Sequence, residues 1–440
     1  MKQLYLVHTL IFTLLFITQI AYSQQAAIPG NNYKTFTDDG SWCWFSDPRA
    51  VYYKDKHERT YVGAVSSEGD IKVGYYDHTS GETIERVITA RFQSDDHVNP
   101  SLLFLPDGRL MIFYTGHNGG FYYTKTLHSE DITQWEEVKT LDMGKRLCYT
   151  NPVLLSEENN RLYLFSRGGY DWKPSYIYSD DLGDTWSKPQ TIVSVPNAPI
   201  SNRPYTKVLS DGKSTIWFAI TDGHPRDEPL NSIYVFYYKE SAFYQTDGKL
   251  LATINNLPFD QNLIHKAYDA NETKVRSWIW DLKLDEEGFP RIVYTRLKDE
   301  TMHTYYYAAW NEKEWKHTFV SNAGQDFLRE KRNKEVMNRE PHYSGGIVLD
   351  DKSIGLVYYS KPIQDRFEII RAELSNDGVK WNETAITQNS VLDNVRPFIV
   401  RNSPPSIQPR LFWMNNLMYK HYTNYRTMIK MDISPSSDNN

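Results

Sequence analysis

A marker that contains proline returns along this sequence at a fixed interval of 52 residues, and no other feature constrains the fold as strongly. The marker is a polar residue followed by Pro at the start of an apolar run, and it occurs at Asp47-Pro48, Asn99-Pro100, Asn151-Pro152 and Arg203-Pro204. With looser spacing the series extends to seven units, at Asp281-Leu282, Glu340-Pro341 and Arg396-Pro397. Units of this length are typical of propeller blades, whose four-stranded sheets are arranged around a central axis.

The segments between the markers have the composition of short β-strands. The chain contains 32 Tyr and 12 Trp, and aromatic and β-branched residues alternate with others in runs such as 161–165 and 214–218. Turn sequences such as Pro106-Asp-Gly108 separate these runs, and long helical periodicity is absent. We therefore predict an all-β, seven-bladed propeller of four-stranded antiparallel blades. Each marker proline should lie near the start of an innermost strand, where its missing N–H need not enter the ladder.

The N-terminus has the pattern of a secretory signal peptide. Lys2 precedes an apolar run from Leu4 to Ile20, and the small-residue sequence Ala21-Tyr22-Ser23 suits a cleavage site. The run is shorter than the roughly 20 apolar residues of a membrane span, and no second such segment follows. We expect a signal peptide over residues 1–23 and one propeller domain over residues 24–440. The protein should then be secreted or periplasmic, monomeric and without a membrane partner.

Composition limits the remaining classes of function. The net charge of −6 argues against a nucleic-acid partner, although it leaves room for a local basic pocket. Two cysteines, Cys43 and Cys148, are too few for a disulfide framework and match no zinc spacing. The stability of so long a chain must therefore come from a large core.

A second motif occurs once in full and twice in degenerate form. Residues 179–186 read Ser-Asp-Asp-Leu-Gly-Asp-Thr-Trp, which is an Asp box with Asp181 as its central acid. We predict a structural role, because the carboxylate can accept backbone N–H bonds within its own turn while Trp186 packs between blades. The box should lie far from the mouth of the channel.

Polar residues occupy equivalent positions in neighbouring repeats and predict a site at one mouth of the channel. His97 and Tyr149 stand two residues before a marker, while His117 and Arg167 follow the second strands of the same two repeats. Arg296 and Lys361 end second strands elsewhere. For any one of these residues the alternative is an ordinary polar strand end in water.

The four residues suit β-elimination at a uronic acid. The reaction needs a cation for the carboxylate, a base for the C5 proton and an acid for the departing O4. Arg167 can bind the carboxylate through its guanidinium fork. His97 or Tyr149 would take the proton, and the other of the two or His117 would protonate the leaving oxygen. We expect Arg203, Tyr205, Arg296 and Lys361 to bind substrate.

Several segments resemble the BNR-repeat propellers that include ulvan lyases. They are residues 41–50, Asp96-His-Val-Asn-Pro100, Tyr114-Thr-Gly-His117, Ser277-Trp-Ile-Trp-Asp281 and residues 342–346. The resemblance implies a secreted seven-bladed lyase that cleaves ulvan, an acidic polysaccharide, between a sulfated rhamnose and a uronic acid. By motif, His97, His117, Tyr149 and Arg167 would form its site, and no cofactor would be required for catalysis.

The resemblance also raises the question of a metal. Some members carry a structural zinc held by His and Cys, and His224 in Asp222-Gly-His-Pro225 resembles the His of that site. The neighbouring Cys ligands are absent from this sequence, and a lone His is weak evidence for a metal. A loop-capping His224 is therefore the alternative to a zinc ligand.

Two other functions remain open at the level of sequence. A hydrolase of sialidase or rhamnosidase type is one, because Asp boxes are frequent in sialidases and Arg49, Arg203, Arg296 and Arg396 could supply its cations. A non-catalytic glycan-binding propeller is the other, since a fold does not by itself imply an activity.

Overall fold

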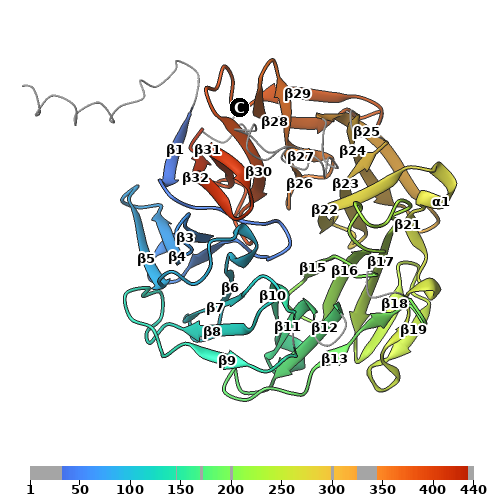
Figure 1. Cartoon of the computed structure of the whole chain (residues 1–440), viewed down its shortest axis with the longest axis horizontal. Coiled ribbons are helices and arrows are strands. Elements are labelled where there is room, and N and C mark those ends of the chain that lie inside the picture. The colour runs from blue at the N-terminus through green and yellow to red at the C-terminus, as the bar shows by residue number, and fades with distance from the viewer. Residues whose placement is uncertain are drawn as a thin grey trace, which may run out of the picture. The chain divides into compact units, whose positions relative to one another are not determined.

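Seven antiparallel sheets follow one another around a closed ring (Figure 1). The computed structural model describes residues 32–144, 146–168, 172–198, 202–298, 302–324 and 344–434, and the seven sheets are those of this part of the chain. We number them as blades 1 to 7 in chain order. The predicted seven-bladed propeller is confirmed.

The first three blades each contain four strands that are consecutive in sequence. Blade 1 is built from β2 (Ala50–Lys54), β3 (Glu58–Val65), β4 (Ile71–Asp77) and β5 (Thr83–Thr89). Blade 2 is built from β6 (Ser101–Phe104), β7 (Leu110–Thr115), β8 (Phe121–Lys125) and β9 (Lys139–Leu141). Blade 3 is built from β10 (Cys148–Leu155), β11 (Arg161–Gly168), β12 (Lys173–Ser179) and β13 (Gln190–Thr191).

Blade 4 departs from the four-stranded pattern and has six strands. They are β15 (Thr206–Ser210), β16 (Thr215–Thr221), β17 (Ile233–Lys239), β18 (Ala242–Gln245), β19 (Leu250–Thr253) and β21 (Lys266–Tyr268), which pairs with β17. Beside this blade β14 (Val193–Ser194) and β20 (Phe259–Asp260) form a short parallel pair.

The last three blades return to four strands. Blade 5 is built from β22 (Arg276–Leu284), β23 (Pro290–Leu297), β24 (His303–Trp310) and β25 (Trp315–Gly324). Blade 6 is built from β26 (Ile347–Leu349), β27 (Leu356–Ile363), β28 (Arg366–Leu374) and β29 (Trp381–Ala385). Blade 7 is built from β30 (Asp393–Ile399), β31 (Leu411–His421), β32 (Asn424–Asp432) and β1 (Tyr33–Thr37).

Helical structure in the described residues is confined to single turns between strands. They are η1 (Asp96–Val98), η2 (Ser156–Glu158), η3 (Ile254–Asn256), η4 (Gln261–Leu263) and α1 (Ala270–Thr273). No helix among the described residues is long and apolar enough to cross a lipid bilayer.

The first strands of neighbouring blades contact one another at several places in the ring, such as β2 with β6, β6 with β10 and β22 with β26, which indicates that these strands lie innermost. The Leu102 N–H donates to the Pro48 carbonyl at 3.0 Å, which joins the starts of blades 1 and 2. The marker prolines behave largely as predicted. Pro48, Pro100 and Pro204 lie just before β2, β6 and β15, whereas Pro152 and Pro397 lie inside β10 and β30. Pro341 lies outside the described residues, as does the signal peptide expected over residues 1–23.

The ring is closed by pairing between the two ends of the chain. Strand β1 adds to the outer edge of β32, with Tyr33 opposite Asp432 and Lys34 opposite Met431 (Figure 1). The ammonium of Lys430 also donates to the Thr35 hydroxyl at 2.6 Å. Because the outer strand of blade 7 comes from the N-terminus, no covalent bond is needed to hold the ring shut.

The Asp box lies between outer strands β12 and β13, as its predicted structural role requires. The Asp181 carboxylate accepts the backbone N–H of Thr185 at 2.8 Å and the Thr185 hydroxyl at 2.6 Å. These donors hold the pKa of Asp181 down to about 2. Gly183 has a φ of +91°, and a Cβ there would meet the Met111 side chain of blade 2 at 2.5 Å. The box therefore packs blade 3 against blade 2, and only glycine fits at its turn.

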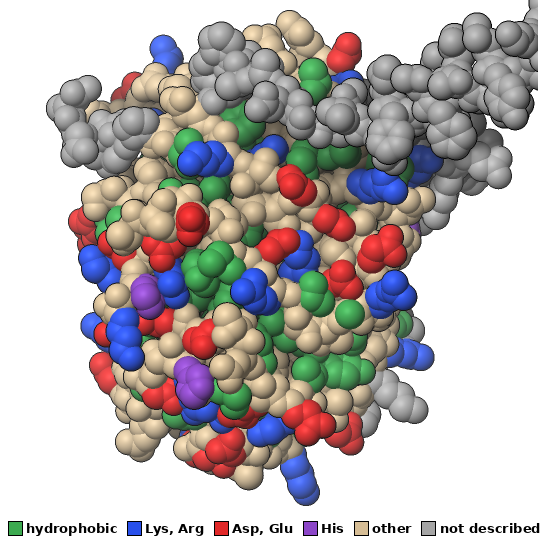
Figure 2. All heavy atoms as spheres, turned by 90° about the vertical axis from the view of Figure 1, so that its left-hand side faces the viewer, with side chains coloured by type: hydrophobic (Ala, Val, Ile, Leu, Met, Phe, Trp, Pro, Cys, Tyr) green, Lys and Arg blue, Asp and Glu red, His purple; other side chains and the backbone are tan. Residues whose placement is uncertain are grey.

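Charge is dispersed on the outer side of the ring. In Figure 2 Lys and Arg side chains are interspersed with Asp and Glu over the visible face.

We expect Asp181→Ala to lower the melting temperature by one or two degrees, because losing this turn removes roughly 1 kcal/mol from a chain of this size. The contribution should be present above pH 4 and should be lost as the pH falls through about 2, since the folded-state pKa of Asp181 is depressed. Calorimetry of the variant beside the exposed-site control Glu287→Ala checks this. Equal melting temperatures for the two variants would contradict it.

Candidate functional site

A short 3-10 turn positions the first candidate residue at the entry to blade 2. Turn η1 begins after Asp95, whose side chain caps it by accepting the backbone N–H of His97 at 2.9 Å. An aspartate before the first helical residue is a preferred cap, because its carboxylate satisfies an orphan donor. This cap fixes the backbone of His97 and brings its ring over the Asp95 carboxylate.

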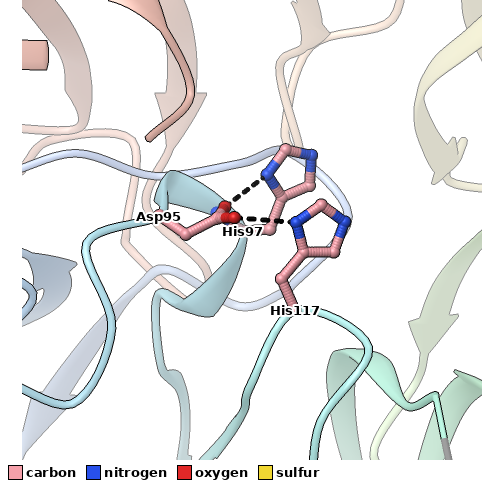
Figure 3. A group of neighbouring side chains, drawn as sticks. All are labelled: Asp95, His97 and His117. Atoms are coloured by element: carbon pink, nitrogen blue, oxygen red, sulfur yellow. Dashed lines mark hydrogen bonds and ion pairs between the residues drawn. The ribbon is translucent and has the colours of Figure 1, made fainter. Parts of the chain in front are cut away.

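One carboxylate holds two imidazoles (Figure 3). Asp95 Oδ1 lies 2.8 Å from His97 Nδ1, and Asp95 Oδ2 lies 2.7 Å from His117 Nδ1. The two rings stack at 4.3 Å between centroids with an interplanar angle of 13°. Both Nε2 atoms point away from Asp95, and the two side chains are 17 % and 18 % exposed.

An aromatic residue of the last blade packs on this pair. Tyr422 lies in the turn between β31 and β32, and its ring meets the edges of His97 and His117 at 4.8 Å and 5.4 Å. Its carbonyl accepts the backbone N–H of Asp96 at 2.9 Å. Residues of blades 2 and 7 therefore meet at the imidazole pair.

Tyr149 and Arg167 come from the first two strands of blade 3. The register of β10 against β11 shifts at Tyr149, whose φ is +63°. Such a bulge re-aims a side chain, and a left-handed non-glycine residue marks a position that the surroundings over-determine. The Tyr149 ring lies 5.9 Å from the His97 ring. Arg167 lies across from Cys148 on the neighbouring strand.

The Arg167 guanidinium is buried between two phenol rings. Its Cζ lies 4.9 Å from the centroid of Tyr149 and 4.1 Å from that of Tyr205. The residue is only 3 % exposed, and within the described chain Nε and Nη1 have no hydrogen-bond partner. A buried cation with two unsatisfied donors is unusual, and this marks Arg167 as a candidate for binding an anion.

The surroundings move the two imidazole pKa values in opposite directions. Burial tends to lower the pKa of His97, but the charges of Asp95 and Asp96 outweigh it and raise that pKa well above 6.5. Burial and the neighbouring charge of His97 lower the pKa of His117 below 6.5. The pKa of Asp95 is depressed despite burial, because both imidazoles face it. At neutral pH the group therefore holds a cationic His97, a neutral His117 and an ionised Asp95.

The phenol of Tyr149 stays protonated at neutral pH. Burial raises its pKa well above 10, and the charges of Tyr205 and Cys43 add to the effect more than Arg167 reduces it. A hydroxyl of this kind can donate a proton but cannot accept one at neutral pH.

A buried ion pair holds η1 in place from below. Asp96 is fully buried, and its Oδ2 accepts Arg396 Nη1 of β30 at 2.5 Å. The Tyr419 hydroxyl of β31 donates to the same oxygen. Arg396 Nη1 also donates to the Trp42 carbonyl at 2.8 Å. The turn that carries His97 is thus joined to blade 7 by charge as well as by Tyr422.

The other predicted substrate-binding residues divide into two groups. Tyr205 belongs to the site, since it lies under Arg167. Arg203 is close by on the same loop, where it pairs with Asp227 at 2.5 Å and lies over Trp172. Arg296 stacks on Tyr306 and Tyr268 in blades 5 and 4, and Lys361 pairs with Glu383 within blade 6. None of their described contacts joins these last two to the site.

His224 lies at the border of the site and behaves as a loop cap. Its Nδ1 accepts the backbone N–H of Arg226 at 3.1 Å, and its ring packs on Tyr205 and Trp278. Burial and the charges of Arg226 and Arg203 lower its pKa well below 6.5. These contacts support the loop-capping alternative. The structural zinc at His224 stays a prediction, since no second ligand to it is described.

Elsewhere in the described chain, a single group has donor atoms close enough together for a metal, and it is Asp95, His97 and His117, within 4.8 Å of one another. Each Nδ1 in this group already lies at hydrogen-bond distance from its own oxygen of Asp95. We therefore interpret it as a hydrogen-bonded group.

Sequence analysis missed three contributors to the site. Asp95 and Asp96 directly precede His97, and two acids before a candidate histidine are a signal that could have identified them. Tyr422 gives no such signal, because its position in blade 7 has no counterpart in the repeat alignment.

Comparisons with known proteins agree with the fold. The model of a family described as "BNR repeat-containing family member" matches residues 59–323. A solved ulvan lyase of polysaccharide lyase family PL25, bound to -[GlcA(1-4)Rha3S]-, is 14 % identical, with a TM-score of 0.66 over 91 % of this chain and 94 % of that one. The polysaccharide lyase Uly1 is 13 % identical, with a TM-score of 0.55 over 93 % of both chains. A search of curated proteins found no match.

We expect Asp96→Asn to destabilise the protein by about 3–5 kcal/mol, because it leaves the buried charge of Arg396 uncompensated. Asp107→Asn is the matched control, since Asp107 pairs with Arg109 at 2.7 Å on the surface, where such a pair contributes less than about 1 kcal/mol. Urea unfolding of both variants measures the difference. Similar losses would show that the buried pair does not hold η1.

Proposed function

Since this chain belongs to the BNR repeat-containing family, we propose that it is a polysaccharide lyase that cleaves ulvan or a closely related polymer by β-elimination at a uronic acid. The observation that carries the proposal is the meeting of the Asp95-held imidazole pair with Tyr149 and the buried Arg167. The likeness in fold to two polysaccharide lyases supports it.

In the proposed reaction a base removes the proton from C5 of the uronate. The electron pair of that C–H bond forms the C4=C5 double bond, the C4–O4 bond breaks, and O4 leaves with a proton from an acid. Developing negative charge on the carboxylate must be stabilised during the first step. The site therefore needs a cation, a base and an acid within reach of one sugar.

Arg167 and His97 supply the positive charge. The guanidinium of Arg167 is buried, and two of its donors, Nε and Nη1, have no described partner, so its charge and donors favour binding of the carboxylate. His97 is cationic at neutral pH, so its Nε2–H can donate to the same group. Both cations are desolvated, which strengthens their effect on charge that develops in the transition state.

His117 acts as the base and Tyr149 as the acid in this proposal. His117 is neutral and gives its Nδ1–H to Asp95, so Nε2 carries the lone pair that takes the C5 proton. Tyr149 keeps its proton at neutral pH and donates it to O4. The assignment departs from the sequence expectation, in which His97 or Tyr149 was the base and the other of the two or His117 was the acid. Return of the proton from His117 to Tyr149 through solvent completes the cycle.

The proposed substrate is an acidic, sulfated, uronate-containing polysaccharide. The PL25 ulvan lyase was solved with a glucuronate–sulfated rhamnose fragment, whose two kinds of anion require more than one cation. Arg203 lies on the loop beside Arg167, and we assign it to a neighbouring sugar. Export through the signal peptide expected at residues 1–23 is part of the proposal, since such a polymer is met outside the cell.

The site argues against a hydrolase that uses two carboxylates. Asp95 is occupied by two imidazoles and Asp96 by Arg396 and Tyr419. Neither can serve as a free acid or nucleophile beside a glycosidic bond. Elimination also leaves a conjugated double bond that absorbs in the near ultraviolet, and hydrolysis does not.

We expect His97→Ala, His117→Ala, Tyr149→Phe and Arg167→Lys each to lower turnover of ulvan by about 10²- to 10⁴-fold without loss of fold. Lysine fails because an ammonium cannot reproduce the bidentate fork. Absorbance of the unsaturated product measures the rate, with Asp107→Asn as the control expected at the wild-type rate. If His117→Ala turned ulvan over at the wild-type rate, His117 would not be the base. The same result for Tyr149→Phe would show that Tyr149 is not the acid.

The pH profile of kcat/KM should have two limbs. Activity should fall on the acid side as His117 is protonated, at a pH below 6.5, because the pKa of that imidazole is lowered. It should fall on the alkaline side as His97 loses its charge, well above 6.5, because that pKa is raised. A single limb centred at 6.5, or an acid limb above it, would contradict the assignment.

A further inference from the structure

Each oxygen of the Asp95 carboxylate hydrogen-bonds one of the two imidazoles, and this determines which nitrogens of the rings carry hydrogen. One oxygen faces His97 Nδ1 at 2.8 Å and the other faces His117 Nδ1 at 2.7 Å. The side chain is 2 % exposed, so its hydrogen bonds are not exchanged with solvent. An ionised carboxylate only accepts hydrogen bonds, and therefore each ring must carry hydrogen on Nδ1.

We propose that Asp95 is the positioning residue of this site: it accepts Nδ1–H from both imidazoles, holds His117 in the Nδ1–H tautomer, and so presents both Nε2 atoms to the substrate. The inference rests on the proposed function, and it adds a residue that touches neither substrate nor the reacting atoms. Partners of this kind set the tautomer and orientation of a histidine through its second nitrogen.

Asp95 also makes the two rings chemically different. The rings stack at 4.3 Å, so two positive charges there would repel each other, and one carboxylate balances a single charge. Asp96 Oδ1 lies 3.0 Å from His97 Nδ1, whereas the charge of Arg167 acts on His117. The extra proton therefore stays on His97. Its Nε2–H is then a donor to the uronate, while Nε2 of His117 is a lone pair.

The other groups around the pair do not provide the same function. Arg396 neutralises Asp96, and Cys43, which is buried, contributes to the raised pKa of His97. Tyr149 and Tyr422 contribute ring edges and faces at 4.8 Å to 5.9 Å. No described hydrogen bond joins His224 to the ring of His97 or His117. Asp95 is the one described carboxylate that hydrogen-bonds both rings.

Substitution of Asp95 by asparagine gives a sharp test, because an amide has one acceptor and one donor end. Its Oδ1 can accept Nδ1–H from one ring, but its NH2 group requires a bare Nδ1 on the other. Asp95→Asn must therefore drive one ring into the Nε2–H tautomer. Long-range ¹⁵N–¹H NMR of the full chain labelled at histidine, without substrate, reads the tautomers of His97 and His117 directly, with signals assigned by His97→Gln and His117→Gln.

We expect Nδ1–H on both rings in the wild-type protein and a change at one ring in Asp95→Asn. Turnover of the variant should fall by roughly 10²- to 10⁴-fold with a smaller change in KM, and the two-limbed pH profile should be lost. Gln93→Ala is the control for loop position, since Gln93 accepts only the backbone N–H of His117. It should leave both tautomers unchanged.

The outcomes separate the inference from the proposed function. A bare Nδ1 on either ring of the wild-type protein overturns the role of Asp95 whatever the reaction is, and this holds even if Asp95→Asn does not fold. Shifts of both ring signals by one equivalent of Zn²⁺, absent in Asp95→Asn, would show a metal site instead. If the NMR result is as expected but ulvan gives no unsaturated product, the proposed lyase activity is wrong and the role of Asp95 in positioning both imidazoles stands.

Discussion

The buried ion pair between Asp96 and Arg396 connects the turn that carries His97 to the last blade of the ring, and the geometry of the site depends on it. Neither charge is accessible to water, so each would be costly without the other. Their partners come from chain positions 300 residues apart. The catalytic histidine proposed here is therefore positioned by the closed ring and not by its own blade alone.

The sequence predicted the architecture well because repetition is a property of the chain itself. The markers at 52-residue intervals identify innermost strands, and the Asp box predicts a turn between outer strands from its own donors and acceptors. The six strands of blade 4 were missed because two of them, β19 and β21, add to the blade in a segment where the marker spacing loosens. Periodicity does not report insertions within a repeat.

The candidate site was predicted in part. Repeat alignment brought His97, His117, Tyr149 and Arg167 into two adjacent blades, as the structure places them, but it placed Arg296 and Lys361 by the same rule. In the structure Arg296 stacks on Tyr306 of its own blade at 3.6 Å. Equivalent backbone positions do not fix where a long side chain points. The sequence likewise does not predict that one oxygen of Asp95 hydrogen-bonds His97 and the other hydrogen-bonds His117, because these contacts depend on the folded structure.

The pairing of β1 with β32 determines when the ring can close during synthesis and folding of the chain. Thr35 and Lys430, which meet across this seam, are 395 residues apart in sequence, so the ring cannot close until the last strand has been synthesised. Contacts this distant are slow to form, and until they form the edges of β32 and β1 remain open to other chains. Arg396 is also synthesised late, so the ion pair with Asp96 forms only after most of the chain has been made. Synthesis of blade 7 is thus the step at which the row of sheets can close and Asp96 can pair with Arg396.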